Sequence, residues 1–123
     1  MVPLQLQSGV SPIAVLGTLI LFSLGLAVTA HVAARNVVAD PDPKRALLVG
    51  PWPAIVSIVG GTLTLPATIT LPAAIALDAA AIRWAYGGPP RRTATITVIH
   101  FTVTVLVTVV VVAASIIWAS RPA

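Results

Sequence analysis

Three titratable side chains lie inside otherwise apolar stretches of the sequence: Asp78, His31 and His100. A carboxylate or an imidazole in hydrocarbon must pair, face water or lose its charge, so each of them is a candidate for chemistry. Asp78 is a candidate relay point for protons or cations; the alternative is a buried hydrogen bond between helices. The same two alternatives hold for the histidines, since an imidazole either relays protons or rests as a satisfied side chain.

Counting the helical rise puts these three groups at similar depths on three different helices. At 1.5 Å per residue, each lies about 6–12 Å from the basic or aromatic residue that ends its stretch. We therefore expect Asp78 to contact a histidine of another helix, either His100 or His31. Arg83 completes this expected intramembrane polar cluster, although it lies about 140° around the helix from Asp78 and is not placed for an i,i+4 pair.

A polar stripe follows the last apolar stretch. Spacings of three, four and seven put its members on one helix face. They are Thr93, Thr97, His100, Thr104, Thr108 and Ser115. We expect the stripe to pack against other helices, with threonine hydroxyls bonded to carbonyls four residues earlier. The alternative is that it lines a narrow aqueous path.

The sequence predicts no metal, no cofactor and no enzyme. Neither a phosphate loop nor an HExxH zinc signature is found, and no nucleophile and base lie at one depth. The one cofactor alternative is a haem ligated by His31 and His100 between the first and last helices.

Composition indicates where the protein resides. Hydrophobic residues make up 58% of the chain and charged residues 8%, against about 25% charged in an average soluble domain. A soluble enzyme and a disordered chain are therefore excluded. The seven basic and three acidic residues give a net charge of +4, which does not build a nucleic-acid-binding patch. We expect an all-α integral membrane protein of one domain, residues 1–123, with the lipid bilayer as partner.

Four apolar spans are predicted in an up-down bundle of transmembrane helices. Their approximate bounds are 12–34, 46–64, 67–86 and 93–118. Ser11 followed by Pro12 predicts the first helix start. The run from residue 46 to 82 would measure about 55 Å as one helix, too long for a bilayer. We predict a tight turn near Pro66; the alternative is three spans, with a kinked or re-entrant segment over residues 60–72.

Loop charges favour four spans. With four, the basic loops 35–45 and 83–92 lie on the same side, which the positive-inside rule makes the cytoplasm. With three, they would face opposite compartments. We therefore expect a multi-pass protein of the cell membrane with both termini outside, and with a short uncharged tail over residues 1–10 before the first span.

Three short segments carry a resemblance. They are Lys44 to Pro51 (KRALLVGP), Leu77–Asp78 followed by Ala81–Ile82–Arg83, and Thr97 to His100 (TVIH). In these segments and in its Ala/Val/Thr-rich spans the chain resembles the uncharacterised multi-pass membrane proteins of halophilic archaea. The resemblance implies a multi-pass membrane protein and brings no assigned activity.

The expected function is that of a small structural or accessory membrane protein. Loops of about ten residues leave no room for a separate catalytic module. We expect the protein to form homo-oligomers or to join a larger membrane complex. The alternative is a small proton or cation channel or transporter that uses Asp78, His31 and His100.

Overall fold

The computed structural model describes residues 11–122, and these residues form helices and no strands. The helices are α2 (Pro12–Arg35), α3 (Pro43–Val49), α4 (Pro51–Thr62), α5 (Ala67–Tyr86) and α6 (Pro90–Ala119). The all-α prediction is confirmed. The predicted N-terminal tail, residues 1–10, lies outside the described residues.

Three of these helices, α2, α5 and α6, are long and apolar enough to cross a membrane. The helices α3 and α4 form one further rod, because Gly50 between them keeps helical angles, φ −53° and ψ −44°. The rod begins at Pro43, inside the segment 35–45 that the sequence predicted as a loop. Asp42 starts it by accepting a hydrogen bond from the backbone N–H of Lys44 at 3.0 Å, as an N-cap does.

Two other predicted boundaries are found at their expected positions. The side chain of Ser11 caps α2 by accepting from the N–H of Ala14 at 3.0 Å. A tight turn joins α4 to α5: the N–H of Leu65 donates to Gly60 (2.8 Å) and that of Thr64 to Gly61 (3.1 Å). These two bonds form a Schellman motif, with Thr64 in the left-handed conformation at φ 54° and Pro66 ending the helix. Residues 60–72 are therefore helix, turn and helix.

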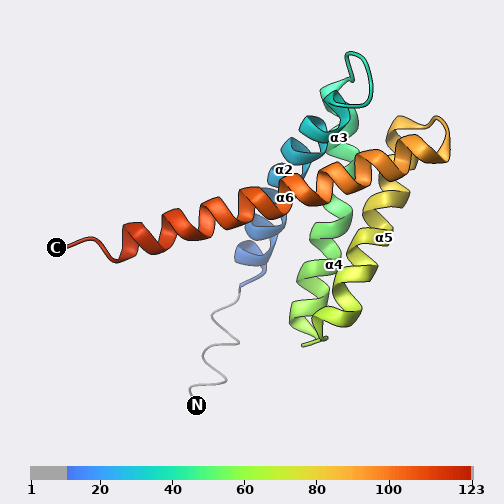
Figure 1. Ribbon diagram of the computed structural model, residues 1–123. Helices are drawn as coiled ribbons and strands as arrows, with labels where there is room; N and C mark the ends of the chain where they lie inside the picture. The colour runs from blue at the N-terminus through green and yellow to red at the C-terminus, as the bar shows by residue number, and fades with distance from the viewer. Residues whose placement is uncertain (1–10, 123) are drawn as a thin grey trace.

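The buried core lies near the end of the molecule that carries the loops 36–42 and 87–89 (Figure 1). Most of its side chains are alanines, which let the helices approach closely. Its members include Ala30, Ala33 and Ala34 on α2, Ala46 and Val49 on α3, Ala81, Ile82 and Ala85 on α5, and Ile96 on α6. Arg45 donates a hydrogen bond to the carbonyl of Ala85, so the start of α3 and the end of α5 are directly joined at this end.

The helix α6 lies across the other helices and does not follow one of them along its whole length (Figure 1). Its first half packs on α2 and α5. From residue 105 to 119 every residue is exposed. This distal half is about 22 Å long and extends away from the other helices (Figure 1).

The close approach of the rod to α2 predicts a specific sensitivity at Gly50. A Cβ there would overlap the backbone carbonyl oxygen of Ser23 on α2, and backbone cannot move aside as a side chain would. We expect Gly50→Ala to lower the free energy of unfolding by about 1–3 kcal/mol, the usual cost of overpacking. Denaturation in detergent micelles followed by circular dichroism measures this.

The matched control is Gly61→Ala on the same rod. A Cβ at Gly61 meets nothing within 4 Å, and alanine favours the helix by up to about 1 kcal/mol. The free energy of unfolding should then stay unchanged or rise. Equal losses from both substitutions would mean that the rod does not approach α2 at Gly50.

Candidate functional site

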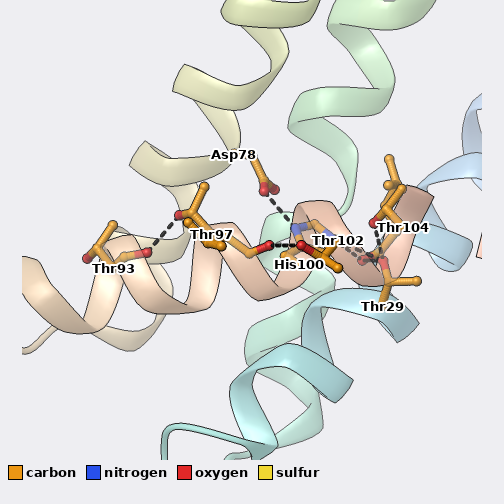
Figure 2. Close-up of polar contacts among 9 residues, drawn as sticks. Thr29, Asp78, Thr93, Thr97, His100, Thr102 and Thr104 are labelled. Carbon is orange, nitrogen blue, oxygen red and sulfur yellow. Dashed lines mark hydrogen bonds and ion pairs between the residues drawn. The ribbon is translucent and has the colours of Figure 1, made fainter. Parts of the chain in front are cut away.

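The centre of the site is a buried contact between Asp78 of α5 and His100 of α6. Oδ2 of Asp78 lies 2.6 Å from Nδ1 of His100, and the side chains are only 8% and 2% exposed. Figure 2 shows the carboxylate pointing directly at the imidazole, where α5 approaches α6. A contact this short is typical of a hydrogen bond between a carboxyl group and an imidazole that share a proton.

The other edge of the imidazole binds α2. Nε2 of His100 lies 3.0 Å from the carbonyl oxygen of Leu26 and 2.9 Å from Oγ1 of Thr29. Thr104 of α6 donates to the same Thr29 hydroxyl at 3.1 Å. His100 therefore joins three helices, α2, α5 and α6, through its two ring nitrogens (Figure 2).

These contacts determine how many protons the pair holds. A carbonyl oxygen only accepts, so the contact with Leu26 requires a proton on Nε2. The 2.6 Å separation between Nδ1 and Oδ2 requires a second proton between them. Whether that proton sits on nitrogen or oxygen, Asp78 and His100 together carry no net charge. A neutral pair is far cheaper to bury than an isolated ion.

The structure brings together two of the four residues predicted as a polar cluster. His31 lies apart from the pair: it lines a separate cavity of about 450 Å³ with Arg35 and Asp40, and its Nδ1 is buried without a partner among the described residues. Arg83 is exposed.

The predicted polar stripe of α6 divides in two. Its first part faces inward: Thr97 is buried and bonds the Thr93 carbonyl at 2.7 Å, and Thr104 reaches Thr29. Its second part is exposed, where Thr108 and Ser115 bond carbonyls four residues earlier, at 2.7 and 2.8 Å. The predicted backbone bonding is thus found at three stripe positions.

Sequence reasoning missed the α2 side of the site. Thr29 was not singled out, although it is buried together with Leu26, Ala30 and Ala33 at helical spacing on α2. That spacing was the available signal. The Leu26 carbonyl has no sequence signal, because every residue carries one.

Within residues 11–122, His31 and His100 are not placed to ligate one haem. Both ring nitrogens of His100 contact protein atoms, so neither is free to ligate iron, and His31 lies in a different cavity. Within residues 11–122, no group of three or more His, Cys, Asp or Glu side chains is placed to hold a metal ion.

Comparison with known proteins gives one match. Residues 9–122 match the profile described as "Family of unknown function (DUF7473)". No curated protein and no solved structure matches the chain.

The pair predicts a graded response at Asp78. Asp78→Leu leaves Nδ1 of His100 buried without a partner, and we expect the free energy of unfolding to fall by about 1–3 kcal/mol. Asp78→Asn should lose less than about 1 kcal/mol, because the amide donates to Nδ1 while Nε2 still donates to Leu26. Chemical denaturation of the variants in micelles compares them.

Two controls accompany this series. Thr102→Val removes an exposed hydroxyl that bonds only the Val98 carbonyl, and its effect should stay within about 0.5 kcal/mol. The double variant Asp78→Leu/His100→Leu should be more stable than the sum of the single losses by about 1–2 kcal/mol, since neither partner is then orphaned. Strict additivity would contradict a coupled pair.

Proposed function

We propose that this chain, which belongs to the DUF7473 family of unknown function, is a small multi-pass membrane protein with a structural or accessory role. In this proposal it associates through the distal half of α6 with further copies of itself or with a larger membrane complex. The affiliation with halophilic archaea expected from the resemblance stays a prediction.

The carrying observation is the distal half of α6, residues 105–119, which is apolar, helical and exposed at every position. Exposed apolar area on this scale marks a surface for lipid or protein contact. At its end Arg121 lies 3.5 Å above the Trp118 ring. A tryptophan with a cation at a helix end is typical of a membrane interface.

A partner helix fits one face of this distal half better than lipid does. Thr108 and Ser115 continue the stripe whose earlier members, Thr97 and Thr104, face the inside of the protein. Ser115 and Ala119 are small residues four positions apart, a spacing that lets helix backbones approach closely. The face that packs in the first half of α6 therefore has the same character in the uncovered half.

Four spanning segments, running up and down, are part of the proposal. The kinked rod of α3 and α4 would supply the second span between α2 and α5. The Arg45–Ala85 contact supports a shared side for the basic loops 35–45 and 83–92, proposed as cytoplasmic, with both termini outside the cell membrane. At about 45 Å, α6 is longer than the hydrocarbon core, so it would cross with a tilt.

The buried pair supports a structural role over catalysis. Both nitrogens of His100 and one oxygen of Asp78 are used to join helices. A general base needs a free nitrogen within reach of a substrate proton. We propose that the chain is not an enzyme on this ground.

Single-cysteine cross-linking tests the proposed association. The chain contains no cysteine, so Ser115→Cys introduces a unique thiol on the stripe of α6. We expect copper-phenanthroline oxidation in membranes to yield several times more disulfide-linked dimer for Ser115→Cys than for Ile117→Cys. The control residue Ile117 is exposed at nearly the same depth but lies about 200° around the helix. Non-reducing gel electrophoresis gives the yields.

Three other outcomes are informative. Equal yields from the two thiols would indicate random collision and contradict association through the stripe. Absence of dimer in both, together with monomers by sedimentation, would contradict self-association. A heavier adduct formed by Ser115→Cys in the native membrane only would identify the larger complex in place of a second copy.

A second candidate function is proton or cation conduction. It is favoured by the proton that Asp78 and His100 share and by Oδ1 of Asp78, which is buried without a partner among residues 11–122. Against it, His31 does not extend the pair into a chain of relay groups.

Flux through liposomes separates the two candidates. For the accessory role we expect purified protein to carry no proton, potassium or sodium flux above that of empty liposomes, measured with pH-sensitive and cation-sensitive dyes. Flux that Asp78→Asn abolishes and Thr102→Val leaves intact would instead establish conduction.

A further inference from the structure

A polar cavity of about 450 Å³ lies where α2 ends, against the loop 36–42 that joins α2 to α3 (Figure 1). Three of its lining side chains are ionisable: His31 and Arg35 of α2, and Asp40 of the loop. None of them contributes to the buried pair or to the exposed half of α6. The cavity is therefore a separate candidate for ligand binding.

The two charged groups on this wall are not paired with each other. Within residues 11–122 the structure holds one ion pair, between Asp78 and His100. The guanidinium nitrogens of Arg35 therefore lie more than 4.0 Å from the carboxylate oxygens of Asp40. A lone anion in the cavity would be repelled by the carboxylate, and a lone cation by the guanidinium. A ligand with one negative and one positive group satisfies both.

The imidazole of His31 adds a hydrogen-bond donor on the side of Arg35. The two residues are four positions apart, so they share one face of α2. Nδ1 of His31 is buried without a partner within residues 11–122, which leaves Nε2 as the ring nitrogen that the cavity can reach. A neutral imidazole with its proton on Nε2 donates from there. An imidazole and a guanidinium together favour a phosphate, which accepts from several donors at once.

The loop that carries Asp40 is fixed at both ends. The N–H of Val38 donates to the carbonyl of Ala34 at 2.8 Å. Asp42 caps α3 by accepting from the N–H of Lys44 at 3.0 Å. Asp40 itself has a left-handed backbone, φ 50°, which Asp and Asn adopt more readily than most residues. The backbone beside the cavity is thus ordered before a ligand arrives, which lowers the entropic cost of binding.

We propose that this cavity binds a phosphate ester that carries an ammonium group, as phosphoethanolamine does. The phosphate accepts from Arg35 and His31, and the ammonium donates to Asp40. An engineered cavity of about 150 Å³ holds benzene, so the volume suffices for such a group. The ester is a lipid headgroup or a soluble phosphodiester, since the end of a spanning helix lies at headgroup depth. The proposal does not depend on the accessory role.

An NMR titration of the purified full chain in detergent micelles tests this proposal. The probes are glycerophosphoethanolamine and glycerophosphoglycerol, which share a phosphodiester and differ in the ammonium group. The chain contains two histidines. We expect a saturable shift of the His31 imidazole signal and a constant His100 signal, because His100 is only 2% exposed. The ammonium ester should bind about two- to fivefold more tightly than the other, as for one solvent-screened ion pair.

Two substitutions separate the charges. Arg35→Gln should weaken the binding of both esters severalfold. Asp40→Asn should abolish the preference for the ammonium ester without weakening the other, and asparagine retains the left-handed backbone. Damage to the loop would instead weaken both esters alike. The control Arg91→Gln removes the same charge as Arg35→Gln from an exposed position outside the cavity, and both affinities should stay within about twofold.

The dihexanoyl lipids with the same two headgroups identify the source of the ester. Tighter binding of the ethanolamine lipid than of glycerophosphoethanolamine supports a lipid headgroup, and equal affinity supports a soluble phosphodiester. Equal affinity of the two soluble esters, or a preference that survives in Asp40→Asn, would overturn the proposal. A His31 shift that rises without saturation would also overturn it, because it would indicate a general effect of charge.

Discussion

The fold depends on one imidazole held between three helices. Most of the core is alanine, and the largest fully buried side chains are Ile82, Ile96, His100 and Val49. Alanines bring helices close but offer few atoms for dispersion contacts. His100 adds directed hydrogen bonds on both edges, to Asp78 on one side and to Leu26 on the other. These bonds determine where along α6 the crossing with α2 occurs. A surface of alanines alone would allow several crossing positions of similar energy.

The close helix packing that small residues permit and the buried Asp78–His100 pair depend on each other. Gly50 lets the rod of α3 and α4 touch the backbone of α2, and Arg45 at the start of this rod binds the last turn of α5. The rod therefore holds α2 and α5 at the separation that a single imidazole can bridge. A neutral pair then completes the bridge without burying a net charge.

Sequence reasoning predicted the helical fold, the turn near Pro66 and a contact of Asp78 with either His100 or His31, because polar groups are so rare in these spans that few partners exist. It could not choose between the two histidines, since helical rise gives a depth but not the direction in which a side chain points. It began the second helix late, because Asp42 and Pro43 read equally well as a loop and as a helix start. The exposure of the second half of α6 was not predictable, because Thr108 and Ser115 continue the polar stripe of Thr97 and Thr104 without a change in character.

The order of the two partners along the chain has a consequence for biogenesis. Asp78 leaves the ribosome 22 residues before His100, which at about 5–20 residues per second is a wait of roughly 1–4 seconds. In the proposed bilayer, an unpaired carboxylate would be energetically costly during this interval. The loop that follows α5 contains Gly87 and Gly88 at positive φ and turns the chain so that the first half of α6 packs on α5. In the proposed membrane we expect the two helices to enter lipid together, after α2, which supplies the contacts for the second edge of His100.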